Sequence, residues 1–151
     1  MSVATAAGAM LGFERSRQNR AIMGFRTLSL VALASCLAVL AIVHSGLPQV
    51  NADAAGRVIQ GVLSGVGFIG AGALIHGAKG SEVHGLATAA SIWVSAALGA
   101  AAALAIWPLI LGGLALALLV LLIGPPLERR IRDHARASAG EGDRQDVERR
   151  P

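Results

Sequence analysis

The chain is poor in aromatic residues, in cysteine and in charge. Of its 151 residues, 3% are aromatic, none is tyrosine and one is cysteine. A single cysteine excludes an intramolecular disulfide and a structural zinc framework built on several cysteines. Cys36 stands inside an apolar run, so we expect a small core residue. Charged residues make up 15% of the chain against 54% hydrophobic ones, a balance that is not typical of a soluble globular domain.

Groups arranged for catalysis are also missing. The sequence has no Ser/His/Asp or Cys/His arrangement and no Walker loop. Residues 65–70 match the pattern G-x-G-x-x-G, but a dinucleotide site needs a preceding strand, whereas these glycines lie in a membrane-length apolar run. His76, Glu82 and His84 share a glycine-rich loop with no recognised metal spacing. The sequence therefore predicts no enzyme, no cofactor and no metal.

The basic residues gather in two clusters rather than along one face. The net charge is +4, with four arginines between residues 15 and 26 and seven more after the last apolar run. Such clusters beside membrane spans are what the positive-inside rule produces, and no nucleic-acid-binding fold accompanies them. We therefore expect the partner of this charge to be a lipid bilayer and not nucleic acid.

Apolar segments of membrane length dominate the organisation of the chain. About 20 apolar residues suffice to cross a bilayer, so the uncharged stretch 85–127 is too long for one span. A turn near 103–107 divides it, with Trp107 at interfacial depth and Pro108 in the opening turn of the next helix. We predict an all-α, polytopic membrane protein with about five transmembrane helices. The segments are about 1–13, 27–45, 57–75 and the two parts of 85–127.

The distribution of Lys and Arg predicts the orientation of these spans. With the N-terminus outside and the C-terminus inside, twelve of the thirteen Lys and Arg residues are cytoplasmic, and Arg57 lies at an outer end. Residues 1–13 rise about 20 Å as a helix, less than the ~30 Å hydrocarbon layer. The first helix is therefore either short and packed beside others, or preceded by one or two further turns.

Composition changes again near the end of the chain. Residues 137–151 hold almost nothing apolar, which is typical of disorder. We expect a transmembrane domain over residues 1–127 and a basic cytoplasmic tail, largely disordered, over residues 128–151.

Residues 57–75 carry the most informative pattern. Eighteen uncharged residues, dense in glycine, separate Arg57 from His76. Since lipid offers no water to the backbone, this run crosses a membrane only as a helix. Its glycines let helices approach closely, and its polar groups must face protein, so packing and a functional polar site both remain open. Helical spacing gives a glycine stripe of Gly61, Gly65, Phe68 and Gly72, and beside it a polar stripe of Arg57, Gln60, Ser64, Gly67 and Ala71.

Polar residues elsewhere supply weaker candidates. Glu14 precedes a run of arginines, so we expect it to pair with a neighbouring arginine or with Arg26. Thr88, Ser91 and Ser95 share one face of the fourth helix. Their hydroxyls either line a pathway or bond back to their own helix.

Three sequence blocks follow one another along the membrane portion. The first is GFER at 12–15 with MGFRT at 23–27, the second is RVIQGVLSGVGFIGAG at 57–72, and the third is GLATAASIWV at 85–94. In these blocks the chain resembles the MgtC/SapB family of bacterial inner-membrane proteins. The middle block is the most specific of the three.

The resemblance implies a multi-pass protein of the bacterial inner membrane, tied to Mg²⁺ limitation and, in pathogens, to virulence. Family members look more like regulators than magnesium carriers, and some are thought to act on the F-type ATP synthase, which the resemblance implies as a partner. Carried over by motif, the functional candidates are Glu14, Arg15, Arg26, Thr27, Arg57, Gln60 and Thr88. The helix-packing candidates are Gly61, Gly65, Gly67, Phe68, Gly70, Gly72 and Gly85. Ala87 stands where some members carry a polar residue.

Three functions are consistent with these observations. The leading hypothesis is a non-enzymatic regulatory or accessory protein linked to magnesium homeostasis and adaptation to low Mg²⁺. The alternative is a cation transporter or channel lined by polar residues of the third and fourth helices, which implies a homo-oligomer because five small helices are few for a solitary carrier. The third is an interaction module whose glycine groove docks a partner helix.

Overall fold

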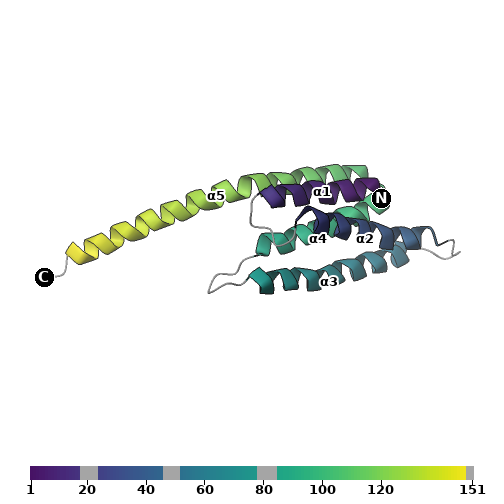
Figure 1. The fold of residues 1–151 in the computed structure, drawn as a ribbon, viewed down its shortest axis with the longest axis horizontal. Coiled ribbons are helices and arrows are strands. Elements are labelled where there is room, and N and C mark those ends of the chain that lie inside the picture. Colours follow the sequence, from purple (N-terminus) through teal and green to yellow (C-terminus); the bar gives the residue numbers. More distant parts are fainter. Residues whose placement is uncertain (18–23, 46–51, 78–84, 149–151) are drawn as a thin grey trace. The chain divides into compact units, whose positions relative to one another are not determined.

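The computed structural model describes residues 1–17, 24–45, 52–77 and 85–148 (Figure 1). Within these ranges the regular structure is helical throughout, which confirms the all-α prediction. The helices are α1 (Ser2–Arg17), α2 (Phe25–Val43), α3 (Ala52–Gly77), α4 (Leu86–Ala103) and α5 (Trp107–Glu148). Four of them, α2 to α5, contain stretches long and apolar enough to cross a membrane. The protein is therefore a polytopic membrane protein, and its orientation in the bilayer stays a prediction.

The structure extends the first predicted helix and locates the turn between α4 and α5. α1 has 16 residues, three more than predicted, and rises about 24 Å, still less than the ~30 Å hydrocarbon layer. Between α4 and α5 the chain turns at Ala105, whose φ is +54°. α5 then begins at Trp107 with Pro108 as its second residue. Proline is tolerated there because the first-turn N–H groups have no partner in the helix, so the predicted division of residues 85–127 is confirmed.

Residues Met1–Leu118 form one compact unit, and Leu119–Pro151 form a second. In the first unit α2 and α4 lie in the middle, with α1 on one side and α3 on the other (Figure 1). The first turns of α5 add a buried residue, Ile110. A Cβ atom placed on Gly113 of the same helix would lie 3.3 Å from Cδ2 of Leu98 in α4.

Close packing in the first unit depends on glycines that the sequence analysis did not select. A Cβ atom on Gly8 would lie 2.5 Å from the carbonyl oxygen of Leu28, and one on Gly12 would lie 2.5 Å from Cα of Phe25. These distances are too short for any side chain, so α1 rests directly on the backbone of α2. A Cβ atom on Gly99 of α4 would collide with the backbone of Ala32 in the same way. The centre of the bundle is therefore a backbone-to-backbone contact between small residues.

The third helix contacts α4 through one narrow stripe. Val66 and Ala73 are buried, and a Cβ atom on Gly70 would lie 3.5 Å from Cβ of Ala89. At the end of this contact Gly85 has φ +99°, a left-handed conformation that favours glycine. A Cβ atom there would also lie 2.8 Å from the carbonyl oxygen of Ala73, so both backbone conformation and space require glycine at this position.

The second unit consists of the later turns of α5, which continue to Glu148. Residues 137–148 are part of this helix, and the largely disordered tail expected over residues 128–151 stays a prediction. Alanine, arginine and glutamate are good helix formers, and the later turns of α5 contain several of each. The boundary between a transmembrane domain and a tail at residues 127 and 128 stays a prediction.

Candidate functional site

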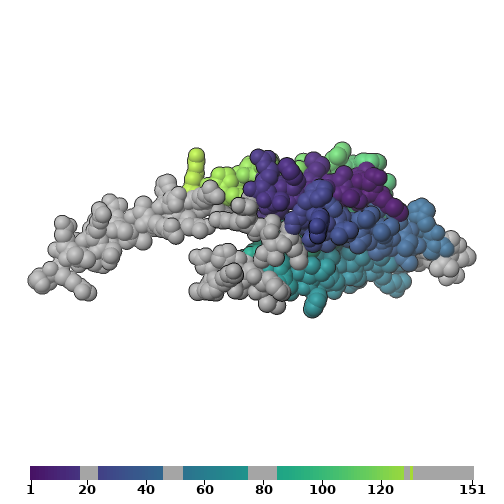
Figure 2. All heavy atoms as spheres, viewed as in Figure 1, coloured from purple at the N-terminus to yellow at the C-terminus, as the bar shows by residue number. Residues whose placement is uncertain are grey.

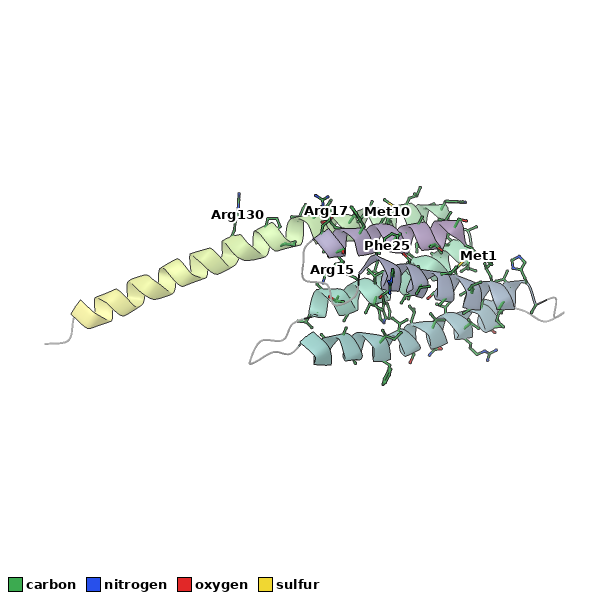
Figure 3. The ribbon with its side chains drawn as sticks, in the orientation of Figure 1. Met1, Met10, Arg15, Arg17, Phe25 and Arg130 are labelled. Atoms are coloured by element: carbon green, nitrogen blue, oxygen red, sulfur yellow. The ribbon has the colours of Figure 1, made fainter. Side chains whose placement is uncertain are left out.

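A buried arginine joins the first and fourth helices. Arg15, in the last turn of α1, is only 7% exposed. Its Nη2 donates a hydrogen bond of 2.6 Å to the hydroxyl oxygen of Thr88, which is 1% exposed. Figure 3 shows Arg15 at the end of α1 away from Met1. Two residues 73 positions apart, from the first and third sequence blocks, thus form one contact inside the bundle.

The start of α4 determines where Thr88 lies. Gly85 is the N-cap residue and provides no side-chain cap, which makes Thr88 the third residue of the helix. The first hydrogen bond along the helix runs from the N–H of Ala89 to the carbonyl of Gly85 at 2.9 Å. The N–H groups of residues 86–88 therefore have no acceptor within the helix, and the positive end of the helix dipole lies beside the guanidinium.

The guanidinium of Arg15 is incompletely satisfied. Among the side-chain atoms that the structure describes, its Nε is the buried nitrogen or oxygen with no hydrogen-bond partner. A buried cation without full hydrogen bonding is costly, because it loses its hydration and gains too little in return. The neighbouring first turn of α4, where the helix dipole is positive, contains no acidic residue.

The hydroxyls of α4 have different roles. The Ser95 hydroxyl donates a hydrogen bond of 2.7 Å to the carbonyl oxygen of Leu28, so it joins α4 to α2. The Ser91 hydroxyl donates to the carbonyl of Ala87 in its own helix, at 2.7 Å. The prediction that these residues share a face is confirmed, since Thr88, Ser91 and Ser95 are all buried.

The remaining candidates of the first block are less buried than Arg15. Glu14 lies 4.0 Å from Arg17, three residues later in α1, which agrees with the predicted pairing to a neighbouring arginine. Arg26 is exposed and Thr27 is partly buried. Neither belongs to the contact between Arg15 and Thr88.

The polar stripe of α3 points away from the bundle. Arg57, Gln60 and Ser64 are all exposed, although residues Asp53–Leu74 form one of the candidate membrane spans. The stripe therefore shares no lining with the buried hydroxyls of α4. In a bilayer these polar groups would face lipid unless another protein covers them.

The predicted packing glycines fall into two groups. Gly70 and Gly85 lie at the contact between α3 and α4. A Cβ atom on Gly61, Gly65, Gly67 or Gly72 would meet nothing within 4 Å beyond the helix's own backbone. Phe68 is 85% exposed. The surface of α3 is visible along one side of the first unit (Figure 2). Within the described residues of this chain that stripe contacts no helix, and its packing role stays a prediction.

No metal centre is found in the part of the chain that the structure describes, where no three His, Cys, Asp or Glu side chains lie close enough to hold an ion. Glu82 and His84 lie outside the described residues. The free Cys36 is buried in the core, as expected.

Sequence reasoning selected both Arg15 and Thr88 but did not pair them. The motif blocks place each residue near a helix end, whereas the pairing depends on how α1 packs on α4. The glycines at 8, 12 and 99 were missed altogether. Ala4, Gly8 and Gly12 recur every four residues, and this small-xxx-small spacing was the available signal.

Similarity to known proteins agrees with the sequence blocks. The model of the MgtC family matches residues 1–130. The protein SrpB of Synechococcus elongatus is 40% identical over 124 residues, covering 76% of this chain and 66% of SrpB. MgtC of Salmonella typhimurium is 37% identical and MgtC of Brucella abortus 42% identical, each over 92 residues covering 61% of this chain.

These relatives are longer than the part they share with this chain. The match covers 36% of the length of either MgtC protein. No solved structure matches the chain. Because the family model covers residues 1–130, well over half of the sequence, this membrane protein belongs to the MgtC family.

Proposed function

We propose that the protein is a non-enzymatic regulatory or accessory protein of the bacterial inner membrane, linked to magnesium homeostasis and adaptation to low Mg²⁺. The observation that carries this proposal is the family match over residues 1–130. The contact between Arg15 and Thr88 supports it, because two of the motif blocks meet there in a buried polar contact. A protein that only had to be stable in lipid would not need such a contact between its helices.

The placement of the polar groups favours a regulator over a solitary carrier. Thr88 and Ser95 are buried and hydrogen-bonded to other helices of the bundle. Arg57 and Gln60 are exposed on α3. A path lined by polar residues of both helices would need these two sets to face a common space, and in the described part of one chain they do not.

Growth at limiting Mg²⁺ tests the proposal. Deletion of the gene should reduce growth at low Mg²⁺ and leave it normal at high Mg²⁺. The natural gene and an Arg17→Ala version should restore growth, since Arg17 is exposed and paired only near the surface. Arg15→Lys should fail, because lysine cannot reproduce the guanidinium fork that reaches Thr88. Unchanged growth of the deletion strain across a magnesium titration would contradict the magnesium link.

A second candidate function, an oligomeric cation transporter or channel, is favoured by one observation. Gln60 and Ser64 are exposed within a candidate membrane span, and polar groups at that depth need protein or water around them. Copies whose α3 helices face one another would provide both. Purified protein in liposomes with a Mg²⁺-sensitive dye tests this, and flux no greater than that of empty vesicles would eliminate it.

As partner we propose a membrane protein that covers α3, and the F-type ATP synthase is the first one to examine, because the family resemblance implies it. Crosslinking in native membranes followed by pull-down should recover the partner with the natural chain. Recovery of a second copy alone would favour a homo-oligomer instead. Absence of any crosslink through α3 would contradict both.

A further inference from the structure

The last helix changes from apolar to basic within a few residues. Residues Trp107–Leu127 of α5 form a candidate membrane span of 21 residues. The next nine residues, 128–136, contain four arginines and are called the basic segment here. α5 continues as one helix through this segment to Glu148. The basic segment therefore lies on the same helix as the span and directly after it.

The length of the span determines the depth of the basic segment. Twenty-one residues of helix rise about 32 Å, which matches the ~30 Å hydrocarbon layer. Headgroups add about 5–8 Å on each side of that layer. The backbone positions of Arg129, Arg130 and Arg132 lie about 3–8 Å along the helix from Leu127, which is within the headgroup layer. The side chain of Arg130 is exposed (Figure 3).

Charge is divided unequally along this part of α5. The basic segment has four arginines against two acidic residues, a formal balance of +2. Residues 137–148 have one arginine against four acidic residues, a balance of −3. The first of these acids, Glu141, lies about 21 Å along the helix from Leu127, more than twice the ~8 Å Debye length at physiological ionic strength. A negatively charged surface at the end of the span would therefore attract the basic segment and hardly repel the acidic one.

A layer of anionic phospholipid headgroups is the partner whose charge and position fit this arrangement. Its negative charge lies at the end of every membrane span, and a cluster of arginines immediately beyond a span is attracted to it. Guanidinium groups also match the phosphate oxygens of a headgroup in geometry. If the arginines only kept the helix soluble, the separation of basic residues near the membrane from acidic residues far from it would have no purpose.

We propose that the basic segment of α5 binds the headgroups of anionic phospholipids at the membrane surface. The positive charge comes chiefly from Arg129, Arg130 and Arg132, which are the three arginines nearest to the span. This contact holds the end of the span at a fixed depth and keeps the acidic turns that follow away from the lipid. The proposal does not depend on the role in magnesium homeostasis.

The lipids retained by the purified full chain test this proposal. The chain is equilibrated in nanodiscs with equal amounts of phosphatidylglycerol, which is anionic, and phosphatidylcholine, which is not. Native mass spectrometry then counts the lipids of each kind that stay bound. One arginine near an anionic surface strengthens binding about fivefold. We therefore expect the ratio of phosphatidylglycerol to phosphatidylcholine to fall about fivefold or more in a variant that combines Arg129→Gln, Arg130→Gln and Arg132→Gln.

The matched control removes the same charge farther from the span. A variant that combines Arg144→Gln, Arg149→Gln and Arg150→Gln should keep the ratio of the natural chain, because Arg144 already lies about 26 Å along the helix from Leu127. Lysine at the three inner positions should also keep the ratio, since a lipid surface recognises charge. Equilibration of the natural chain at about 1 M salt should lower the ratio, because the Debye length is then only ~3 Å, and this measurement needs no variant.

Four results would overturn the proposal. An equal ratio in the natural chain and the inner glutamine variant would show that the basic segment does not select lipid. An equal fall in the outer variant would show that only net charge matters. Loss of the preference with lysine would point to a partner that reads the guanidinium group, such as an acidic protein. A ratio that does not change at high salt would exclude attraction between charges.

Discussion

Two stripes of glycine in this molecule have the same spacing and opposite surroundings. Gly8 and Gly12 of α1 lie directly on the backbone of α2, where a Cβ atom would come within 2.5 Å of it. A Cβ atom on Gly61 or Gly65 of α3 would meet no other helix within 4 Å in the part of the chain that the structure describes. The first stripe holds the bundle together. The second is a smooth, exposed surface beside the polar groups of Gln60 and Ser64.

The comparison teaches that glycine spacing determines how closely another helix can approach, and not which helix does so. Small residues every four positions allow two backbones to approach. Which stripe finds a partner within the chain depends on the order and direction of the other helices. α1 is short and sits on one side of the central pair, so it must gain its stability from close contact.

The largest predicted effect is therefore on the first stripe. Gly12→Leu places a branched side chain where Cα of Phe25 lies, so α1 must move away from α2. We expect the free energy of unfolding to fall by about 3 kcal/mol, the upper end of the usual range for overpacking. Apparent Tm in detergent, followed by size-exclusion chromatography, measures this.

The matched control is the same change on the other stripe. A Cβ atom on Gly61 would meet nothing within 4 Å among the described residues beyond its own helix, so Gly61→Leu should change the free energy of unfolding by less than about 0.5 kcal/mol. Equal losses of stability in Gly12→Leu and Gly61→Leu would contradict the distinction between the two stripes.

The sequence predicted the architecture well because membrane helices leave a strong signal. Length, hydropathy and the positions of Trp107 and Pro108 set the helices and the turn between the last two. Packing was harder to predict. Hydropathy emphasised residues 57–75, whereas α1 is short and less apolar, and nothing in a single sequence says which of two similar stripes is used within the chain.

The next effect concerns the polar contact between α1 and α4. Thr88→Val keeps the shape of the side chain but removes the acceptor for Nη2 of Arg15. Hydrogen bonds to charged groups contribute about 1.5–3 kcal/mol, so we expect a loss of stability in that range. Gln60→Leu on exposed α3 is the control and should leave the Tm unchanged. An unchanged stability in Thr88→Val would show that the hydrogen bond between Arg15 and Thr88 contributes nothing to folding.

This candidate site was only half predictable from sequence. Arg15 and Thr88 entered through motif blocks, and their burial follows the rule that polar groups in a membrane bundle face protein. Their pairing, and the unsatisfied Nε of Arg15, depend on the rotation of α1 about its axis. That rotation is set by Gly8 and Gly12, which the sequence reading had not selected.

A smaller effect separates the two serines of α4. Ser95→Ala removes a hydrogen bond to the carbonyl of Leu28 across the helix interface, at a cost of about 0.5–1.5 kcal/mol. Ser91→Ala removes a bond within the same helix, which contributes little to stability, so its Tm should stay closer to that of the natural chain. Unfolding of both variants under identical detergent conditions checks the order. The reverse order would contradict the role of Ser95 in joining α4 to α2.

The variant that we expect to change stability least is the most informative about partners. Gly65→Leu should change the free energy of unfolding by less than about 0.5 kcal/mol, because a Cβ atom there would meet nothing within 4 Å among the described residues beyond its own helix. It should nevertheless abolish co-purification of any protein whose helix lies on the glycine stripe of α3, since a leucine prevents close approach of two backbones. Arg57→Ala, on the neighbouring polar stripe, should spare that co-purification if the glycine stripe alone makes the contact. Loss of the partner in Arg57→Ala with retention in Gly65→Leu would instead assign the contact to the polar stripe, where a charged residue in a membrane protein needs a counterpart.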